Sequence, residues 1–451
     1  MDGGTGADFG EMLPALNVTP PGPASRAFAE RLRAVESRNV TYLAARWPVF
    51  WAEARGANVR DADGNVYIDL TGGFGVALAG HGHPQILGAL HEQADQLVHG
   101  MGDVHPPAPK VTLLEELARL SPWGDAVGVL ASTGSEAVEI ALKTALLSTG
   151  KPGVVALEGG YHGLTMGALA ATERPDFRAP FARRLYAGVQ HLPFPGGRGG
   201  QSASVAEALV TLEEVLARGT PNGDPIGAVI VEPVQGRAGA RPLSAELARG
   251  IGELAHQHGA LVIADEVLTG VGRCGAFLAS PLVGLEPDVV CLGKALGGGM
   301  PLSACLAPRS VMDAWPATEG EALHTSTFLG HPLSCASALA SLRVLTSEEG
   351  MARIRERGER VAGLLHERLS RLPGVVEIRG LGLLLGIELR GDGGSPPAVD
   401  VAERVLSEGV LVLPAGDRGQ VLELLPAMVL NDAQTDHAVE VLVRAIGATG
   451  Q

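Results

Sequence analysis

The sequence predicts an α/β protein whose larger domain contains a mostly parallel sheet. Between about residues 126 and 293, short apolar runs alternate with amphipathic helical stretches, and repeated strand–helix–strand units are typical of parallel sheets. Apolar residues make up 46% of the chain and aromatic residues only 4%, which indicates a core of small aliphatic side chains. The 451 residues are enough for two domains.

Composition excludes several classes of protein. The formal net charge of -15 argues against a nucleic-acid surface, because phosphate binding depends on clusters of Lys and Arg. No apolar run approaches the roughly 18 residues that a membrane span needs, and the first residues lack the features of a signal peptide. The cysteines are scattered, so we expect reduced thiols in a cytoplasmic protein rather than a zinc site or a disulfide framework. They are Cys274, Cys291, Cys305 and Cys335.

The N-terminal part of the chain predicts an arm followed by a helix and a small sheet. Residues 1–24 are typical of a flexible arm. A Pro-Gly-Pro break precedes a predicted helix over residues 25–38, and alternating runs around an Asp-Gly-Asn turn predict a small antiparallel sheet up to residue 75. In the following GHGHP, we interpret His81 and His83 as part of a loop that leads into a helix, not as metal ligands, since no further ligands accompany them.

The stretch GVLASTGSEAVEIALK predicts a strand, a tight turn and a long helix. Its turn contains Thr133, Gly134 and Ser135. Backbone N–H groups at the start of a helix, together with the helix dipole, favour an anion such as a phosphate. The alternative is an ordinary Ser/Thr-capped helix whose first turn is completed by Glu139.

Two further predicted strands lead into polar residues. The strand VVALE is followed by a Gly-rich turn with Tyr161 and His162, and the strand GAVIVE ends at Glu232. An aromatic ring in such a turn can stack on a flat heteroaromatic ligand. The alternative for Tyr161 is a tyrosine that packs under its own loop.

Lys294 has a setting that suits covalent chemistry. It is one of only four lysines, and it stands between the buried-type strand DVVCLG and a patch of glycines. The others, Lys110, Lys143 and Lys151, have ordinary surface settings. Partial burial lowers the pKa of a lysine amine and frees it to attack a carbonyl group. That is the requirement for a Schiff base.

Asp265 ends the apolar run ALVIAD. Pyridoxal 5'-phosphate (PLP) needs such an acid beside its pyridine nitrogen, because the protonated ring is the electron sink for a carbanion. The carboxyl ends of parallel strands line the ligand crevice of a sheet, so we predict that Asp265 and Lys294 meet there. The alternative for Asp265 is a helix N-cap or a turn residue.

Beyond Lys294 the strand–helix alternation stops. A helix is followed by alternating strands and then by a final strand and helix, which indicates a second domain from about Gly330. We therefore predict an arm at residues 1–24, a large cofactor-binding domain at residues 76–329, and a small α+β domain formed by residues 25–75 and 330–451.

Several spaced motifs together resemble one family. They are DGNVYIDLTGG, GHGHP, STGSEA, YHG, VEPVQG, DEVLTGVGR, LGKALGGGMP and TSTFLGHP. From about Pro20 to its end, the chain resembles the class III (omega-type) aminotransferases of fold type I, including the 4-aminobutyrate and ornithine aminotransferases. The resemblance implies a large domain with a seven-stranded sheet, a small domain made from both chain ends, PLP as cofactor, and a homodimer or dimer of dimers with its sites at the interface.

The resemblance also implies a role for each matched residue. Lys294 is similar to the Schiff-base lysine, Asp265 to the partner of the pyridine nitrogen, and Tyr161 to the ring-stacking aromatic. Thr327, in TSTFLG, resembles the threonine that binds the phosphate in the neighbouring subunit's site. The implied cofactor-binding set is Thr133, Gly134, Ser135, Tyr161, His162, Glu232, Asp265, Val267, Lys294 and Thr327.

Three positions depart from the family pattern. Leu268 stands where many relatives have Gln, and His331 stands where Asn is usual. Glu423 replaces an Arg that binds a substrate carboxylate and pairs with the acid at Glu232 in many members. Two neighbouring carboxylates raise one pKa or attract a cation, so we hypothesise that the outer pocket prefers a neutral or cationic group such as a distal amine. The alternatives are that Arg418 supplies the guanidinium or that Glu423 turns outward.

The leading functional prediction is transamination between an amine or amino acid and a 2-oxo acid. A racemase or epimerase of the same family is the main alternative, because it uses the same carbanion and returns the proton to the same carbon. A nucleotide-binding α/β protein could use STGSEA for a phosphate, but the chain lacks both GxxxxGK[ST] and a GxGxxG after its first strand.

Overall fold

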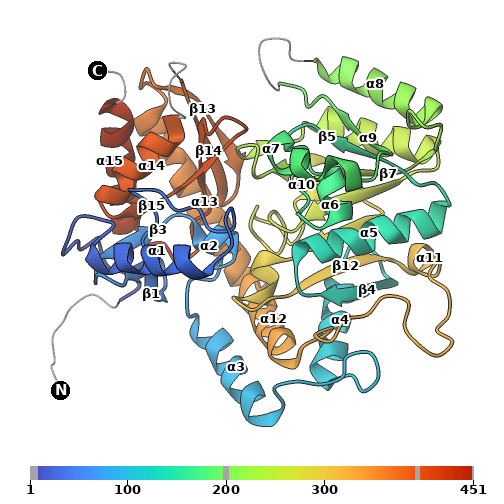
Figure 1. Ribbon diagram of the computed structural model, residues 1–451, viewed down its shortest axis with the longest axis horizontal. Coiled ribbons are helices and arrows are strands. Elements are labelled where there is room, and N and C mark those ends of the chain that lie inside the picture. The colour runs from blue at the N-terminus through green and yellow to red at the C-terminus, as the bar shows by residue number, and fades with distance from the viewer. Residues whose placement is uncertain (1–8, 197–202, 392–396, 449–451) are drawn as a thin grey trace. The chain divides into compact units, whose positions relative to one another are not determined.

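The computed structural model describes residues 9–196, 203–391 and 397–448. The chain divides into two compact units, the first formed by Met1–Pro84 with Arg353–Gln451 and the second by Gln85–Ala352 (Figure 1). Each unit has its own buried core. Within the described ranges, no helix has the length and apolar character that would let it cross a membrane.

The second unit contains the predicted sheet, which has seven strands and is mostly parallel. In spatial order these are β4 (Ala126–Ala131), β12 (Ser303–Pro308), β11 (Val289–Leu292), β10 (Leu261–Glu266), β7 (Ile226–Val231), β5 (Gly153–Leu157) and β6 (Val189–Leu192). Only β12 runs antiparallel to its neighbours β11 and β4. The fold-class prediction is therefore confirmed. Because β5, β7, β10 and β11 are parallel, the loops after them leave the sheet at the same edge.

Helices cover this sheet through small side chains. The helix α5 (Gly134–Thr149) packs on β11 and β12 with Ala137, Val138 and Ala141, all fully buried. The other elements of the unit are α3 (Pro84–Gln96), α4 (Ala108–Leu120), α6 (Met166–Ala171), α7 (Pro175–Arg178), η1 (Ala179–Arg184), α8 (Val205–Arg218), β8 (Val234–Gln235), β9 (Arg241–Pro242), α9 (Ala245–Gln257), α10 (Ser280–Val283), η2 (Lys294–Gly297), α11 (Arg309–Met312) and α12 (Pro332–Leu345).

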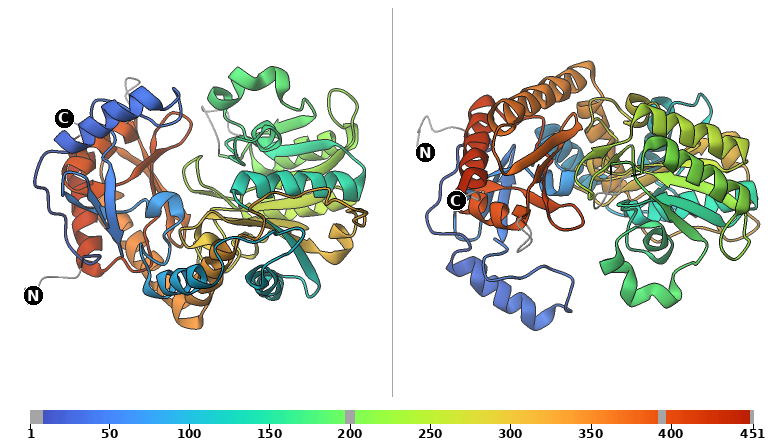
Figure 2. Two further views of the ribbon diagram at one scale, coloured as in Figure 1. Left: turned by 60° about the horizontal axis from the view of Figure 1, so that its bottom comes forward. Right: turned by 90° about the horizontal axis from the view of Figure 1, so that it is seen from above.

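The first unit is built on two four-stranded sheets. One contains β1 (Trp51–Arg55), β2 (Asn58–Asp61), β3 (Val66–Asp69) and β15 (Val410–Leu411), and the other β13 (Val375–Leu381), β14 (Leu384–Leu389), β17 (Val421–Leu424) and β16 (Leu413–Ala415). The antiparallel pairing of β1, β2 and β3 confirms the prediction made from the Asp-Gly-Asn turn. Both views in Figure 2 show the red helix α15 (Asp432–Gly447) beside the orange strands. The remaining helices are α1 (Pro23–Val35), α2 (Gly72–Gly75), α13 (Glu348–Leu369), which continues from the second unit, and α14 (Pro397–Ser407).

Two features differ from the predicted domain layout. The helix α12, which we assigned to the small domain from residue 330 onward, packs against α4 and η2 of the second unit, so the chain enters the first unit only after Ala352. The predicted flexible arm lies outside the described residues up to residue 8. Beyond that, Ala15 exchanges backbone hydrogen bonds with Val66, and Met12 N–H donates to Asn58 Oδ1 over 2.9 Å, which attaches this part of the arm to the sheet.

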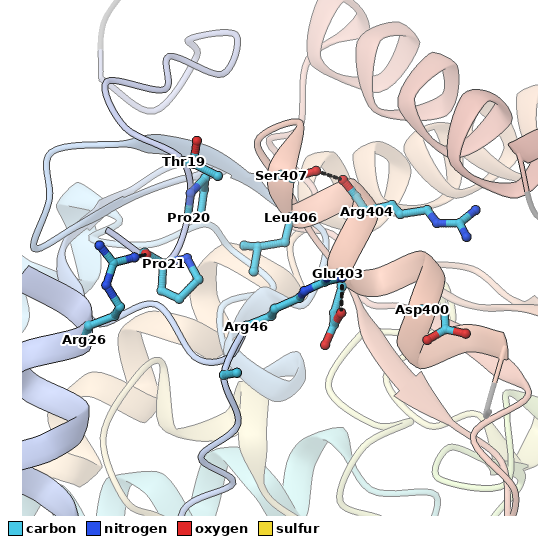
Figure 3. A pocket seen from close by; sticks show the side chains of 11 residues that line it. Thr19, Pro20, Pro21, Arg26, Arg46, Asp400, Glu403, Arg404, Leu406 and Ser407 are labelled. Atoms are coloured by element: carbon cyan, nitrogen blue, oxygen red, sulfur yellow. Dashed lines mark hydrogen bonds and ion pairs between the residues drawn. The ribbon is translucent and has the colours of Figure 1, made fainter. Parts of the chain in front are cut away.

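A surface pocket of about 630 Å³ lies within the first unit (Figure 3). Its charged lining includes Arg26, Arg46, Glu403 and Arg404, and Arg46 is paired with Glu403 over 3.4 Å. None of the predicted site residues lines it. The predicted catalytic and cofactor-binding residues, from Thr133 to Thr327, all belong to the second unit.

Candidate active site

Lys294 follows β11 and begins the short helix η2. Its φ of 44° is unusual for a residue with a side chain, and such strained conformations concentrate at functional sites. The rest of η2 is held by α12, since Ser337 Oγ donates to Gly297 O and Ser341 Oγ to Ala295 O, each over 2.7 Å. The helix α12 thus anchors the turn that presents a partly buried lysine.

The amines of the other three lysines are engaged in polar contacts. Lys151 Nζ donates to His258 O over 2.6 Å, and Lys143 Nζ is 3.2 Å from His324 Nδ1. Lys110 is partly buried rather than at the surface, because its amine reaches Gly102 O at 2.6 Å. Burial lowers the pKa of Lys110.

Asp265 is held in place at the carboxyl end of β10. One carboxylate oxygen is 2.9 Å from His162 Nδ1, and the other accepts the Val267 N–H over 3.1 Å. The hydrogen bond from Val267 is the turn contact that the alternative interpretation of Asp265 predicted. The carboxylate is nevertheless buried, with only 5% of the side chain exposed. His162 is itself held in place, since its backbone N–H donates to Thr172 Oγ1 over 2.8 Å.

Asp265 raises the pKa of His162. Burial alone would lower the pKa of His162, but the hydrogen bond and the negative charge of Asp265 outweigh it and raise the pKa above its usual value. His162 Nε2 is buried and has no hydrogen-bond partner among the described residues. The pair therefore places the imidazole of His162 behind an oriented carboxylate.

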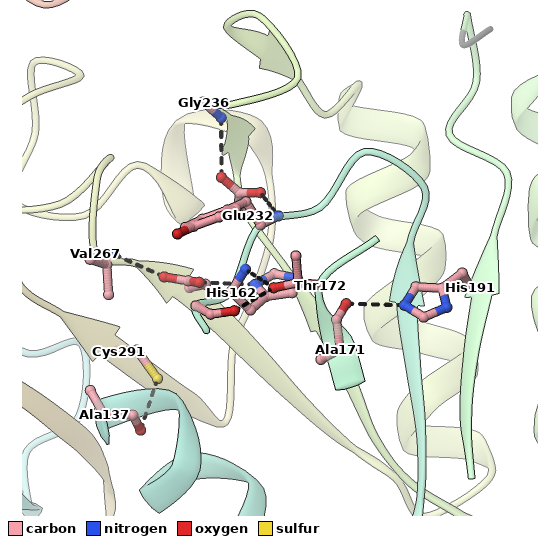
Figure 4. Close-up of polar contacts among 12 residues, drawn as sticks. Ala137, His162, Ala171, Thr172, His191, Glu232, Gly236, Val267 and Cys291 are labelled. Carbon is pink, nitrogen blue, oxygen red and sulfur yellow. Dashed lines mark hydrogen bonds and ion pairs between the residues drawn. The ribbon is translucent and has the colours of Figure 1, made fainter. Parts of the chain in front are cut away.

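Glu232 lies next to this pair, immediately after β7. It is 6% exposed and accepts hydrogen bonds from Tyr161 N–H at 2.9 Å and Gly236 N–H at 3.1 Å (Figure 4). Burial raises the pKa of Glu232 to about 7. His162 lowers this pKa, and the negative charge of Asp265 raises it. Its charge therefore changes near neutral pH.

The Tyr161 ring is half-buried beside these groups. It contacts Phe177 edge-on, with ring centroids 6.3 Å apart, and burial raises the pKa of its hydroxyl group. The ring is not packed entirely under its own loop, since part of it is exposed. It therefore offers an aromatic surface next to Asp265 and His162.

The start of α5 contains a helix cap. Thr133 and Glu136 form a capping box, in which Thr133 Oγ1 accepts from Glu136 N–H and Glu136 Oε2 accepts from Thr133 N–H. The capped-helix alternative is thus correct for Thr133, with Glu136 in the position that we assigned to Glu139. Glu139 instead accepts from Thr165 Oγ1 and Gly167 N–H, near the start of α6.

This cap leaves the N–H groups of Gly134 and Ser135, which an α-helix does not use internally, available for a ligand. The hydroxyl of Ser135 is engaged with Thr165 Oγ1 at 2.7 Å, so the backbone is the better donor. A Cβ built on Gly134 would lie 2.7 Å from Val267 Cγ1, and one on Gly293 would lie 3.1 Å from the same atom. Val267 therefore fills the space between the start of α5 and the residue preceding Lys294.

The contacts bring most of the predicted set together. Two hydrogen-bonded pairs, Tyr161 with Glu232 and His162 with Asp265, form one cluster because Tyr161 and His162 are consecutive in the chain. Val267 connects Asp265 to the start of α5 and the turn of Lys294. Thr327 is exposed, and no hydrogen bond or ion pair joins it to this cluster within the described ranges. Sequence reasoning missed Thr172, whose hydroxyl anchors His162, because a threonine at the end of a short helix carries no distinctive signal.

The departures from the family pattern have defined places. His331 caps α12, with its Nδ1 accepting from Ser334 N–H at 3.4 Å. Glu423 is on β17 and 1% exposed, so the alternative that it turns outward is wrong. Arg418 is exposed. Glu423 belongs to the first unit and Glu232 to the second, so their proximity stays a prediction.

The residues of the second unit fit the donor set that PLP needs. A buried carboxylate held by an imidazole suits a protonated pyridine nitrogen. The N–H groups at the start of α5 suit a phosphate, and the glycine at position 134 keeps this cradle open. The aromatic face of Tyr161 suits a flat ring, and Lys294 supplies the amine for the aldehyde.

Comparisons with known proteins agree with this geometry. The family model for aminotransferases of class III matches residues 42–446. An acetylornithine aminotransferase of Methanothermobacter thermautotrophicus is 35% identical over 93% of this chain and 99% of its own length. A 5-aminovalerate aminotransferase of Pseudomonas putida is 34% identical over 88% and 92%. The solved structure of an amine transaminase from an uncultivated Pseudomonas species, in its PLP-bound form, has a TM-score of 0.83 and 29% identity over 92% of this chain and 98% of that one.

Proposed function

Because the chain belongs to the class III aminotransferase family, we propose that Lys294, Asp265 and their neighbours carry out PLP-dependent transfer of an amino group from an amine donor to a 2-oxo acid. The transferase activity and the cofactor follow from the family. The assignment of roles to residues is supported by the cluster of Asp265, His162, Glu232 and Tyr161 at the strand ends.

When bound, PLP supplies the electron-accepting ring that stabilises a carbanion at the amine-bearing carbon. Asp265 would bind the ring nitrogen of the cofactor, with His162 holding the carboxylate in orientation. Gly134 and Ser135 would bind the phosphate through their N–H groups, and Tyr161 would contact the ring.

Lys294 is the group that moves the proton. Its amine takes the proton from the amine-bearing carbon of the donor as a general base and then, as a general acid, delivers it to the cofactor rather than back to that carbon. The strained turn at Lys294 is anchored by Ser337 and Ser341, so the amine is positioned by the rigid helix α12. Val267 closes the space beside the lysine and limits the access of water.

We also propose that the donor has a neutral or cationic distal group. Support comes from Glu423, whose side chain is 1% exposed and stands where many relatives have Arg. Relative rates with 4-aminobutyrate and 1,4-diaminobutane test this proposal, and a strong preference for 4-aminobutyrate contradicts it.

A racemase function finds no support, since the named relatives are aminotransferases. A panel of amine donors and 2-oxo acids, scored for both amino transfer and loss of optical activity, tests the transferase assignment. We expect the near-visible absorbance of the purified protein to be lost when a donor is added alone. Absorbance that persists while an optically pure amino acid racemises would contradict the proposal.

We propose that the active form is a homodimer in which Thr327 of the partner subunit contacts the phosphate. The segment that contains Thr327 is exposed and includes Leu323 and Phe328, which are 70% and 59% exposed. Exposed apolar side chains of this size commonly mark an interface.

We further propose a cytoplasmic location, because all four cysteines are buried and unpaired, as is typical of a reducing compartment. Cell fractionation tests the location.

A further inference from the structure

Arg174 is fixed next to the loop that carries Tyr161. The preceding residue, Glu173, binds this loop twice: its N–H donates to Gly160 O over 2.8 Å, and its Oε2 accepts from Gly159 N–H over 3.0 Å. Because Arg174 is the next residue, its backbone is held close to the loop of Tyr161.

The side chain of Arg174 lies against the aromatic neighbour of Tyr161. Its guanidinium is 4.5 Å from the centre of the Phe177 ring, and that ring touches Tyr161 edge-on. Two of the five N–H groups of Arg174 bind Asp176, at 3.0 and 2.7 Å. The side chain is only 15% exposed, and its remaining N–H groups keep the capacity to bind a further acceptor.

Arg237 lies in the turn between β8 and β9. This turn is attached to the loop, because Gln235 Nε2 donates to Glu158 O over 2.9 Å. A Cβ built on Gly159 would lie 3.1 Å from Ala238 Cβ. The residues on both sides of Arg237 thus touch the Tyr161 loop.

Both guanidinium groups act electrostatically on Tyr161. Burial raises the pKa of the Tyr161 hydroxyl, and the charges of Arg237 and Arg174 oppose that rise, Arg237 more strongly. A positive charge can lower the pKa of a phenol only from a short distance through the protein. The half-buried Tyr161 ring is therefore within electrostatic reach of both arginines.

We propose that Arg237, assisted by Arg174, binds the carboxylate of the 2-oxo acid acceptor beside Tyr161. This inference rests on the proposed function and assigns the acceptor's carboxylate to residues of the second unit. A carboxylate accepts paired N–H groups from arginine in a favourable planar geometry. The chain has 35 Lys and Arg against 50 Asp and Glu, so two arginines beside one tyrosine form a local site for an anion in an acidic protein.

The proposal also accounts for the acid at Glu423. An enzyme with a distal-amine donor and a 2-oxo acid acceptor needs a carboxylate site that does not repel the donor. With the carboxylate site placed at Arg237 and Arg174, the position of Glu423 is free to carry a negative charge. The two substrates can then use different side chains in successive half-reactions.

The test compares Arg237→Gln and Arg174→Gln with a matched control, Arg241→Gln. Arg241 lies on β9 of the same hairpin, but its guanidinium stacks on Phe194 at 4.1 Å and one N–H donates to Pro195 O at 3.4 Å. We expect Arg237→Gln to raise the KM for pyruvate roughly 10- to 100-fold, as for the loss of a charged hydrogen bond. Arg174→Gln has a smaller effect in the same direction, and Arg241→Gln leaves the KM unchanged.

Two readouts separate carboxylate binding from general damage. The rate at which 1,4-diaminobutane, which has no carboxylate, bleaches the near-visible absorbance stays within about twofold of wild type in all three variants if the proposal holds. Propanoate, an unreactive carboxylate, perturbs the same absorbance, and its dissociation constant rises in Arg237→Gln. If Arg237→Gln does not fold, Arg237→Lys is used instead, because it keeps the charge and loses the paired geometry, and its KM for pyruvate still rises.

The outcomes are distinct. Wild-type protein that transfers no amino group overturns the proposed function and its acceptor site together. Wild-type protein that transfers amino groups, with an unchanged KM for pyruvate in Arg237→Gln, overturns only the carboxylate site. An equal loss with pyruvate and with 1,4-diaminobutane also overturns it, because that pattern reports damage to the Tyr161 loop.

Discussion

His162 Nδ1 lies 2.9 Å from Asp265 Oδ2, and both side chains are almost completely buried, at 1% and 5% exposure. A buried carboxylate is stable only when its hydrogen-bonding capacity is used. His162 therefore positions the acid that we assign to the cofactor's ring nitrogen.

Replacing His162 by Leu is expected to weaken cofactor binding roughly 10-fold or more, because an unpaired buried polar group costs about 1–3 kcal/mol. His162→Asn keeps a donor near the place of Nδ1 and should retain most of the affinity. Titration of the cofactor against near-visible absorbance measures both. Equal affinities in wild type and His162→Leu would contradict the positioning role.

The raised pKa of Glu232 predicts that the stability of the folded protein depends on pH. Its pKa in the folded protein is about 7, above the ordinary 4.5, because of burial. Protonated Glu232 therefore stabilises the folded protein fully below pH 4.5, and this stabilisation is lost as the pH rises through 7. The full pKa shift corresponds to roughly 3 kcal/mol of unfolding free energy. Glu232→Gln cannot ionise, so its melting temperature relative to wild type should rise between pH 5 and pH 8.

The loss of one acceptor in Glu232→Gln lowers stability by a similar amount at every pH, so only the trend with pH is diagnostic. A difference in melting temperature that is constant from pH 5 to pH 8 would show that Glu232 does not titrate in this range.

Gly134→Ala tests the cradle at the start of α5. The added Cβ would lie 2.7 Å from Val267 Cγ1, and such overpacking costs about 1–3 kcal/mol. We expect roughly 10-fold weaker cofactor binding, and Gly134→Ala placed in a Val267→Ala background should cost much less. Gly363→Ala, in the exposed part of α13 with nothing within 4 Å of its Cβ, is the matched control and should not weaken binding.

Complementation tests the proposed dimer. Lys294→Ala and Thr327→Ala each impair their own homodimers, the first completely. If Thr327 acts in the partner subunit's site, a co-expressed heterodimer of the two variants contains one site with both residues intact. Activity of the mixture should then exceed that of either variant alone. No gain after confirmed heterodimer formation would contradict the shared site.

The sequence predicted the fold of the second unit well, because its parallel strands are continuous apolar runs with polar residues directly after them. Asp265, Glu232 and Lys294 could be placed at one edge of the sheet from strand order alone. The pairing of His162 with Asp265 could not, since the two residues come from different strand–loop units and their contact depends on how the chain folds between them.

Local competition between hydrogen-bond partners explains other differences. Glu136 rather than Glu139 completes the cap of α5, because residue 136 is in the third helical position and reaches back to Thr133. The helix α12 stays with the second unit because its Ser337 and Ser341 bind the turn of Lys294. Neither serine stood out in a helix that is otherwise apolar.

The identity of the lysine that binds the cofactor tests the account most directly. The chain has only four lysines, so borohydride reduction of the purified protein followed by peptide mass mapping can examine each one. We expect the pyridoxyl mass on Lys294, with loss of the near-visible absorbance in Lys294→Ala. The mass on Lys110, whose amine also has a pKa lowered by burial, or on Lys143 or Lys151, would contradict the account.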